Sequence, residues 1–596
     1  HDQAYLQGIA RDTWRFFERC VGAEDNHLPP DNLQTMPHDM VAHRTSPTNI
    51  GLYLLSVACA RQFGWIDTPE LVSRLQATLT TMARLQRHNG HLLNWYDTES
   101  CAPLLPMYVS TVDSGNLSGH LLAVAQACRE LALGMPATDT DTAATYTATD
   151  RATATGQTQA RLAALAADCE QLAWEPDYAF LYHRKRNLFH IGYRVAEQQL
   201  DASFYDLLAS ESRLTSLLAI AKGDVPVRHW AALGRPFYAV GAHAGLRSWS
   251  GSMFEYLMPS LVLDEPRGSV LHGAGSCALR EQVAFARQHG VPWGISESAY
   301  AGRDDTLAYQ YAPQGVPALA LRRTPTDELV IAPYATALAA LIAPHTATQN
   351  FAALEKLGAR GRYGFIEALD YSVPRRTGAE PYVPVSTFMA HHQGMTIVAL
   401  THVLMNGAPQ RWGMANAHLQ AVSSLLHERA PREVSRLHAP PAGLRRGVQR
   451  RQSPGLLREV LPGSSAVEPT HMLSNGRYNV ALRASGAGVS RWQGRNITRW
   501  RDDALRDGYG SFFFVKWDGQ TQSHSVTQHP APDPQALYQS VFHADRVSFD
   551  AQWTDLHAHT TVWVSPEDDI EFRQVELRNQ SAHTLTVELT SAFEVT

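Results

Sequence analysis

The chain has 596 residues, of which 44% are hydrophobic and 18% charged, and its formal net charge is −6. This length exceeds what one compact core usually organises, so we expect two or more domains. The composition excludes wholesale disorder, and the lack of a basic stripe argues against nucleic acid or an anionic membrane as the main partner.

The cysteine spacing and the two ends of the sequence bear on the redox compartment and on whether the chain is part of a longer protein. Six cysteines, at positions 20, 59, 101, 128, 169 and 277, show no paired spacing, which predicts free thiols in a reducing compartment. There is no apolar run of about 18 residues, so we expect no direct membrane insertion by this segment. The chain opens without methionine and stops inside a strand-like pattern. We therefore expect a segment of a longer protein.

Residues 1–435 show mostly helical periodicity. Stretches such as 4–21 and 69–87 carry apolar residues at intervals of three and four, and long Gly/Pro/aromatic loops separate them. No short repeat is visible, which disfavours a helical solenoid. The pattern predicts a mainly α domain, an α/α toroid with its functional residues on the loops at one end.

Two biased segments interrupt this pattern. Residues 137–160 are a low-complexity Thr/Ala stretch, for which we expect a flexible connection. Residues 436–462 are rich in Pro, Gly and Arg. Their arginines could form a phosphate or lipid patch, but a solvated linker is the favoured interpretation.

After the linker the periodicity changes from helical to strand-like. Residues 463–596 alternate apolar and polar side chains and are rich in Val, Phe and Thr. This pattern predicts a β-sandwich. Because the alternation continues to the last residue, we expect the sandwich to be incomplete.

Several segments of the helical domain set acids and amides among aromatic and small residues. They are "STVDSGNLSGHL", "FYDLLASESRLTS", "SWSGSMFEYLMPS", "PWGISESAY" and "RYGFIEALDY". Ligands rich in hydroxyl groups need carboxylates and amides for hydrogen bonds and aromatic planes against apolar sugar faces. We therefore expect a carbohydrate cleft. Its predicted binding residues are Asp113, Asn116, Arg213, Trp249, Glu255, Tyr256, Trp293, Tyr300, Tyr309, Tyr311, Tyr363, Phe365, Glu367, Asp370, His391, His392 and Gln393.

Other chemistries fit less well. The chain has no GxSxG, no P-loop and no GxGxxG opening a helix, so no cofactor is predicted. His391 and His392 are adjacent, but no acid lies three or four residues away, which disfavours a metal site. Cleavage of a glycosidic bond would instead need two carboxylates. The candidates are Glu211, Glu255, Glu297, Glu367 and Asp370.

Two of these acids differ in their surroundings. Glu297 has no adjacent cation; taken alone it could cap a helix, but its aromatic neighbours favour a cleft. Glu211 precedes the apolar run "LTSLLAIA", which would desolvate it and raise its pKa, whereas Arg213 would lower it. The sequence leaves open which effect prevails.

Seven ordered motifs carry a resemblance to a known family. "YDLLASESRLTS", "SWSGSMFEYLMPSLV", "GVPWGISESAY", "YQYAPQGVPALALRR", "APYATALAAL", "GARGRYGFIEALDY" and "MAHHQGM" resemble the glycoamylase-like domain of cyclic β-1,2-glucan synthases. The segment that begins "EPTHMLSNGRYNVALRASGAGVSRW" is similar to the β-sandwich that opens their phosphorylase-like region.

The resemblance implies a fold, an activity and a location. It implies an (α/α)6 barrel that closes linear β-1,2-glucan into a ring by anomer-retaining transglycosylation. Carried over by motif, Glu211 is implied to be the acid/base and Glu297 the nucleophile, with Ser212 where the family commonly has alanine. The implied partners are linear β-1,2-glucan and other domains of one large membrane-embedded enzyme, at the cytoplasmic face of the inner membrane.

Two other functions remain open at this point. A hydrolase on the same fold, of the inverting endo-β-1,2-glucanase type, would hold its carboxylates about 6.5–9.5 Å apart, whereas a retaining enzyme needs about 5 Å. A non-catalytic module would bind β-glucan and leave its size distribution unchanged. For a retaining transglycosylase, Tyr300, Tyr309 and Tyr311 are expected to line the acceptor side.

Overall fold

The computed structural model describes residues 2–134, 148–304, 307–325, 327–376, 380–431, 457–460, 462, 469–500 and 509–595. The chain divides into two compact units, residues 1–438 and 439–596. All described helices lie in the first unit. The structure is 38% helix and 27% strand, so the expected mainly α character applies to the framework of the first unit and not to the whole chain.

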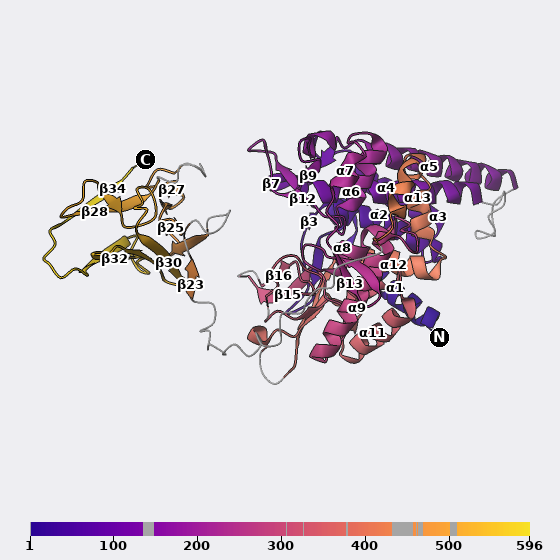
Figure 1. The fold of residues 1–596 in the computed structure, drawn as a ribbon. Helices are drawn as coiled ribbons and strands as arrows, with labels where there is room; N and C mark the ends of the chain where they lie inside the picture. Colours follow the sequence, from indigo (N-terminus) through magenta and orange to yellow (C-terminus); the bar gives the residue numbers. More distant parts are fainter. Residues whose placement is uncertain are drawn as a thin grey trace. The chain divides into compact units, whose positions relative to one another are not determined.

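Six helices in the described part of unit 1 are buried along most of their length and follow one another around a ring. Figure 1 shows the helices of unit 1 packed together. At four of the five junctions between successive inner helices the two helices pack against each other, and the last inner helix packs against the first. One junction is made by Arg213, whose guanidinium donates to the carbonyl oxygens of Glu255 and Tyr256. These inner helices are α2 (Pro47–Gln62), α4 (Thr111–Gly134), α6 (Arg213–Lys222), α8 (Met253–Leu257), α10 (Pro333–Ala339) and α12 (Ala390–Leu404).

An outer helix packs against each inner one and buries only one face. In α3, for example, Leu71, Leu75, Leu79 and Met82 are buried at intervals of three and four. This alternation of inner and outer helices is the arrangement expected of an (α/α)6 toroid. The outer helices are α1 (Asp2–Cys20), α3 (Thr68–Met82), α5 (Ala148–Trp174), α7 (Arg228–Ala232), α9 (Val270–His289) and α11 (Pro344–Lys356), and α13 (Ala408–Met414) and α14 (Ala417–Val422) follow the ring.

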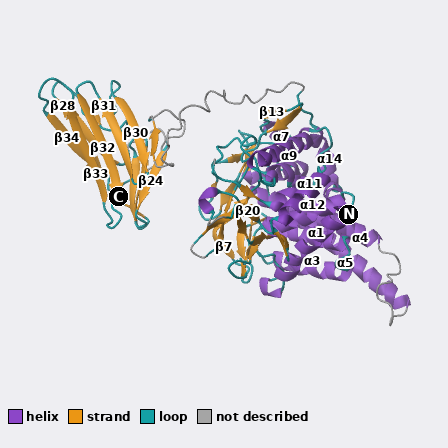
Figure 2. Cartoon of the chain, turned by 90° about the horizontal axis from the view of Figure 1, so that it is seen from below, coloured by secondary structure: helices purple, strands orange, loops and turns teal. Residues whose placement is uncertain are grey.

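The long loops of unit 1 contain short strands, many of which gather on one side of the helices (Figure 2). The largest sheet has the order β11-β10-β7-β6-β3, and three-stranded sheets have the orders β2-β1-β22, β12-β9-β8 and β17-β20-β21. Their shorter members include β2 (Met40–Val41), β8 (Tyr182–His183), β9 (Leu188–His190), β10 (Gly192–Arg194), β11 (Gln199–Leu200), β17 (Val330–Ile331) and β21 (Val383–Val385). The strands that bear on the site are β1 (Asn32–Gln34), β3 (Arg44–Thr45), β6 (Asn94–Asp97), β7 (Pro103–Ser110), β12 (Phe204–Tyr205), β15 (Ser298–Arg303), β16 (Tyr309–Ala312), β20 (Ala368–Asp370) and β22 (Thr387–Met389).

The Thr/Ala-rich stretch 137–160 is not wholly a flexible connection. Residues 137–147 lie outside the described residues, but helix α5 begins at Ala148. Alanine favours helices, and further along α5 a buried stripe that includes Leu162, Leu165 and Cys169 holds the helix against α4. The prediction was therefore wrong for 148–160, because packing of the rest of the helix outweighs the low helix propensity of threonine.

Unit 2 is a set of antiparallel sheets. A five-stranded sheet has the order β23-β30-β31-β32-β33, and smaller sheets have the orders β24-β25-β26-β27 and β29-β28-β34. In β32 buried and half-buried residues alternate, as the sequence pattern predicted. The bounds are β23 (Leu457–Val460), β24 (Thr470–Ser474), β25 (Tyr478–Arg483), β26 (Gly488–Trp492), β27 (Arg495–Asn496), β28 (Ser511–Trp517), β29 (His524–Ser525), β30 (Leu537–His543), β31 (Arg546–Gln552), β32 (Leu556–Val564), β33 (Glu571–Asn579) and β34 (Val587–Phe593).

The end of the predicted linker belongs to this unit. Residues 457–460 form β23 and pair with β30, so the linker expected over 436–462 is wrong at its C-terminal end. Residues 432–456 lie outside the described residues. Leu457 and Val460 enclose two consecutive charged residues and show no alternation, so the sequence carried little strand signal here.

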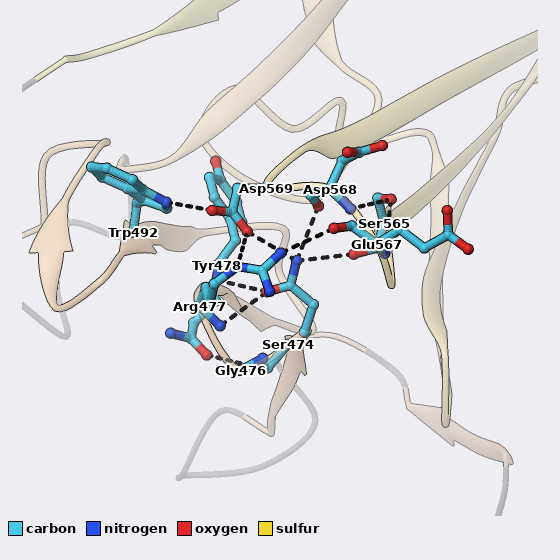
Figure 3. Close-up of polar contacts among 11 residues, drawn as sticks. Ser474, Gly476, Arg477, Tyr478, Trp492, Ser565, Glu567, Asp568 and Asp569 are labelled. Carbon is cyan, nitrogen blue, oxygen red and sulfur yellow. Dashed lines mark hydrogen bonds and ion pairs between the residues drawn. The ribbon is translucent and has the colours of Figure 1, made fainter.

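A polar cluster joins the β24–β25 hairpin to the turn between β32 and β33 (Figure 3). The Asn475 side chain donates to the carbonyl oxygens of Ser565 and Asp568, both at 3.0 Å. Asp569 accepts from Arg477 at 2.9 Å and from the indole of Trp492 at 2.7 Å. The hydrogen bonds satisfy the polar groups of both turns and so link two sheets of the unit.

Two further observations concern the chain as a whole. No helix among the described residues is long and apolar enough to cross a membrane. All six cysteines are free, as their spacing predicted, and all but Cys101 are buried.

Candidate active site

A cavity of about 410 Å³ opens at the loop side of the ring, and both Glu211 and Glu297 line it. Its wall combines carboxylates, amides, hydroxyls and aromatic rings, as hydroxyl-rich ligands require. The other lining residues are Asp31, Arg44, Ser46, Thr48, Asn94, Trp95, Ser110, Val112, Asp113, Asn116, Tyr205, Phe254, Tyr311, Met389 and His391.

Glu211 lies in the tight turn that leads from β12 into α6. The Ser210 hydroxyl accepts from the backbone N–H of Ser212 at 3.2 Å and holds this turn. Helix α6 approaches α4 closely at Gly115, where a Cβ atom would lie 1.8 Å from the Thr215 hydroxyl. Only glycine allows this approach, which brings the Glu211 turn to the α4 side of the cavity.

Arg213 does not face the cavity, although the sequence placed it among the binding residues. Its side chain is fully buried and forms an ion pair with Glu265. Its remaining N–H groups donate to the carbonyl oxygens of Ser210, Glu255 and Tyr256. A buried guanidinium needs all its donors satisfied, and the partners of Arg213 lie in the protein interior. The prediction of Arg213 as a binding residue was therefore wrong.

Glu297 projects from the loop between α9 and β15 and caps no helix. Gln282 of α9 clamps the loop, donating to the carbonyl oxygen of Ile295 at 2.6 Å and accepting its N–H at 2.7 Å. Gly294 has a φ of +130°, which favours glycine, and its carbonyl oxygen accepts from Ala332 at 2.7 Å. The "PWGISESAY" segment is thus a rigid support for one carboxylate.

The two carboxyl groups are both difficult to ionise. Burial, together with the nearby charges of Glu255 and Glu297, raises the pKa of Glu211 to about 8. Burial also raises the pKa of Glu297 to about 7, although a hydrogen bond from the Tyr311 hydroxyl favours its ionised form. Desolvation therefore outweighs Arg213 at Glu211, which answers the question that the sequence left open.

Tyr311 connects Glu297 to two histidines of α12. Its hydroxyl hydrogen-bonds the Glu297 side chain and lies 3.2 Å from Nε2 of His391 and 3.3 Å from Nε2 of His392. On its other side, Nδ1 of His392 lies 2.9 and 3.0 Å from the two carboxyl oxygens of Glu367. A continuous chain of polar contacts therefore runs from Glu297 to Glu367.

Two more pockets adjoin the cavity, each sharing a different set of lining residues with it. A pocket of about 490 Å³ shares Tyr205 and Glu211 with it and is also lined by Trp249 and Glu255. Another, of about 330 Å³, shares Arg44, Tyr311 and Met389 with it and is also lined by Tyr309. Pockets in series are suited to a linear oligomer, each residue of which needs its own subsite.

The structure brings only part of the predicted binding set to the cavity. Asp113, Asn116, Tyr311 and His391 line it, and Trp249, Glu255 and Tyr309 line the adjoining pockets. The expectation that most of the eight predicted aromatic residues share one groove with Glu297 is wrong, because only Tyr311 lines the cavity itself.

The other aromatic residues of that set build the walls behind the cavity. Tyr256, Trp293, Tyr363 and Phe365 belong to the hydrophobic core. Tyr300 packs under the guanidinium of Arg375, whose central carbon lies 4.6 Å from the ring centroid. Aromatic residues at helix ends often serve as core, and a sequence does not show which way they point.

Five residues predicted as polar contacts are also satisfied internally. Glu255, a lining residue of one adjoining pocket, forms a capping box with Ser252 at the start of α8. Asp370 is fully buried and accepts from Arg375 at 2.6 Å and from the Ala301 N–H at 2.9 Å. The prediction that it contacts a sugar was therefore wrong. Gln393 is buried and donates to the carbonyl oxygen of Tyr363 at 2.6 Å. His392 and Glu367 are buried against each other.

The cavity contains residues that the sequence did not single out. Asp31, Arg44 and Trp95 come from three separate loop strands and their flanks, and the Arg44 guanidinium lies 5.3 Å from the centroid of the Trp95 ring. The side-chain oxygens of Asn94 and Asn116 are buried without a hydrogen-bond partner, so both can accept from a ligand hydroxyl. The segment "LLNWYD" places an amide and an acid beside aromatic residues, which is the same pattern that marked the other candidate segments. This pattern could have identified Asn94 and Trp95.

Two family models match the chain, one within each unit. The Glycoamylase family model, described as "Putative glucoamylase", matches residues 203–408. The model for the supersandwich domain of glycosyl hydrolase 94 matches residues 462–596. The chain is 37% identical to the cyclic β-(1,2)-glucan synthase NdvB of Rhizobium meliloti over 99% of its own length and 24% of that protein. It thus spans about a quarter of the curated relative that it matches.

Solved structures share the fold of unit 1. A "putative glucoamylase" from Bacteroides caccae has a TM-score of 0.56 at 17% identity, covering 72% of this chain and 99% of its own. An endo-β-1,2-glucanase from Chitinophaga pinensis, in complex with sophorotriose and glucose, has a TM-score of 0.55 at 15% identity, covering 73% and 100%. The resemblance predicted from the motifs is therefore confirmed: a segment that matches the Glycoamylase model precedes one that matches the glycosyl hydrolase 94 supersandwich model, and the chain is similar over nearly its whole length to part of a cyclic β-1,2-glucan synthase.

Proposed function

We propose that the chain is an anomer-retaining transglycosylase that cyclises linear β-1,2-glucan. The observation that carries the proposal is the convergence of Glu211 and Glu297, from two different loops, on one cavity that shares lining residues with two further pockets. The 37% identity to a cyclic β-(1,2)-glucan synthase supports this substrate.

The surroundings of the two carboxyl groups suit different roles. Glu211 has the higher pKa, about 8, and holds its proton at neutral pH, as a general acid must. Glu297 has a pKa of about 7 and receives the Tyr311 hydrogen bond, so it is the group more readily ionised and hence the nucleophile.

These roles define the reaction. The Glu297 carboxylate attacks the anomeric carbon of a glucosyl unit while Glu211 protonates the departing glycosidic oxygen, which releases the reducing-end fragment. A 2-hydroxyl from the far end of the bound chain then attacks the glycosyl-enzyme. Glu211 accepts the proton of this hydroxyl, and Glu297 leaves. Two inversions at the anomeric carbon retain its configuration, and the product is a ring.

Ring closure requires the tethered hydroxyl to outcompete water. Water is present at about 55 M, whereas a well-oriented intramolecular group reaches an effective molarity of about 10⁵–10⁸ M. The pocket that contains Tyr309 and adjoins Glu297's cavity is suited to hold the incoming sugar and to displace water from it.

One alternative has specific support. The fold of unit 1 is shared with an endo-β-1,2-glucanase, so an inverting hydrolase on the same cavity is the second candidate. In that case a water molecule replaces the enzyme nucleophile, and Glu297 has no covalent role.

One experiment distinguishes the two. The protein is incubated with linear β-1,2-glucan, and the products are analysed by mass spectrometry and by NMR of the anomeric protons. Cyclisation gives products that lack one water relative to linear chains of the same length. Linear products whose new reducing ends first appear in the α configuration would favour the hydrolase and refute the proposal.

We also propose that this activity operates within a larger polypeptide at the cytoplasmic face of the inner membrane, beside other catalytic domains. The similarity to a segment of NdvB supports this context. Fractionation of cells that produce the complete protein, followed by immunodetection of this segment, tests it.

A further inference from the structure

The buried pair His392–Glu367 lies behind Tyr311 and outside the cavity. Neither residue lines the cavity, and both side chains are almost inaccessible, at 1% and 2% exposure. The ring of Tyr334 stacks on His392, with centroids 3.6 Å apart and an angle of 9° between the planes. The Tyr334 hydroxyl in turn donates to the backbone carbonyl of Glu297 at 2.6 Å. His392 is thus fixed in position relative to the Glu297 loop.

The hydrogen-bond donors in this chain can be assigned by counting protons. Tyr311 has a single hydroxyl proton, and it favours the ionised form of Glu297 only when it is donated to that carboxylate. The Tyr311 oxygen then has to accept from His392, so Nε2 of His392 must carry a proton. Nδ1 of His392 faces the Glu367 carboxyl group.

Glu367 has its own orienting contact. Its Oε1 accepts from the backbone N–H of Ala299 at 3.1 Å, which leaves Oε2, 3.0 Å from Nδ1 of His392, to share a proton with the ring. Burial raises the pKa of Glu367 to about 8, which agrees with a proton held between this carboxyl group and His392 at neutral pH.

We propose that Glu367 and His392 are positioning residues that hold one shared proton, so that Nε2–H of His392 donates to Tyr311 and the Tyr311 hydroxyl donates to Glu297. The inference rests on the proposed role of Glu297 as the nucleophile. When the pair loses one of its two protons, the remaining proton stays on Nδ1, hydrogen-bonded to the Glu367 carboxylate, and Nε2 is left without a proton. The Tyr311 hydroxyl then turns to His392, and Glu297 loses its hydrogen bond.

Other charged and titratable groups face this chain and act on the same carboxylate. Glu255 of α8, Asp113 of α4 and, once it is ionised, Glu367 make ionisation of Glu297 harder by repulsion. His391 lies 3.2 Å from the Tyr311 hydroxyl, and burial lowers its pKa to about 3, so it is neutral at working pH. The remaining groups are Asp31, Arg44, Tyr205, Glu211 and Tyr334.

The test uses three substitutions of Glu367 with different hydrogen-bonding ability. In Glu367→Gln the Ala299 N–H orients the amide oxygen, so the amide NH₂ faces Nδ1 of His392 and donates to it. Glu367→Met removes the donor. Glu367→Asp keeps the charge but is one methylene too short to reach His392.

The main readout requires no turnover. Carbodiimide labelling of Glu297 is followed by peptide mass spectrometry as a function of pH, which reports the pKa of this carboxyl group. We expect Tyr311→Phe, Glu367→Met and Glu367→Asp each to raise that pKa by about 1 and to lower kcat at least about tenfold. Glu367→Gln should rescue most of both losses.

A double variant tests whether the pair acts through Tyr311. The combination of Tyr311→Phe with Glu367→Met should match Tyr311→Phe alone, because the pair then has nothing left to position. Additive effects of the two substitutions would overturn the proposal. It would also be overturned if Glu367→Gln were as impaired as Glu367→Met while Glu367→Asp behaved like the parent protein. If Glu367→Met does not fold, Glu367→Asp and Glu367→Gln still decide.

The labelling also separates this inference from the proposed function. If the parent protein makes no cyclic product but the labelling shifts as expected, the proposed function fails and the proton chain stands. If cyclic product forms and the pKa of Glu297 is the same in Tyr311→Phe and Glu367→Met as in the parent, the proton chain is refuted and the proposed function stands.

Discussion

Nε of Arg213 lies 2.7 Å from Oε1 of Glu265, and both side chains are buried. Arg213 is two residues from Glu211, so this ion pair anchors the turn that carries one proposed catalytic group to the loop that precedes helix α9. Arg213→Met should destabilise the protein by about 3–5 kcal/mol, because it leaves the Glu265 charge buried and unpaired. Urea denaturation, followed by loss of activity and by circular dichroism, measures the change.

The double variant Arg213→Met/Glu265→Met is the matched control. It removes both charges and should lose less stability than the single change at Arg213. Equal or greater loss in the double variant would mean that the packing of the arginine, and not the charge pairing, dominates.

The roles of Glu297 and Glu211 can be distinguished by rescue with azide. Glu297→Ala should lose more than about 10³-fold in kcat, and azide that enters the vacated space should give an α-glycosyl azide, since only one inversion occurs. Glu211→Ala, supplied with a donor that has an activated leaving group, should give a β-glycosyl azide. The anomeric configuration of each product is read by NMR.

Glu197→Gln is the control for that experiment. It removes a carboxylate that is exposed on the surface and has no proposed part in the reaction, so the rate should be unchanged. The reverse pattern, with a β-azide from Glu297→Ala and an α-azide from Glu211→Ala, would exchange the two roles. Absence of azide products from both variants would count against a glycosyl-enzyme.

The pH dependence of kcat/KM follows from the two carboxyl groups. Activity should rise as Glu297 ionises near pH 7 and fall as Glu211 loses its proton near pH 8, which gives a narrow bell with its maximum between these values. Because the two groups repel each other when ionised, the apparent pKa values of the two limbs describe the pair and not either carboxyl group alone. A profile with both limbs below pH 6 would show that the site is more hydrated than its burial indicates.

Trp95 should contribute to substrate binding. Trp95→Ala should weaken binding of linear β-1,2-glucan oligosaccharides about tenfold, since the loss of an aromatic face against a sugar costs about 1.4 kcal/mol. Calorimetric titration measures the affinity. Trp563 of β32, which stacks on Phe572 in unit 2, is a control whose replacement by Ala should leave the affinity unchanged.

Tyr309 tests the proposed acceptor side. Tyr309→Ala should raise the ratio of linear to cyclic product more than it lowers total cleavage, because water gains access where the incoming sugar was held. Tyr300→Ala is the comparison, since this ring packs under Arg375 and lines none of the three pockets. If both variants change the product ratio equally, the effect comes from loop stability and not from an acceptor subsite.

The sequence by itself determined the local features of this protein. Helical spacing predicted the helices of unit 1, the strict alternation predicted the strands of unit 2, and the motifs around Glu211 and Glu297 identified two acids that line one cavity. These features depend on neighbours within a few residues, whose periodicity and turn chemistry a sequence displays directly.

Only the tertiary structure decided which other side chains share that cavity. Trp95 and Arg44 reach it from loops remote in sequence from Glu297, whereas Trp293, four residues before Glu297, points into the core. Glu255, which looked like a sugar contact, caps helix α8. The direction of a loop side chain depends on long-range packing of the helix ring, and no short sequence pattern encodes that packing.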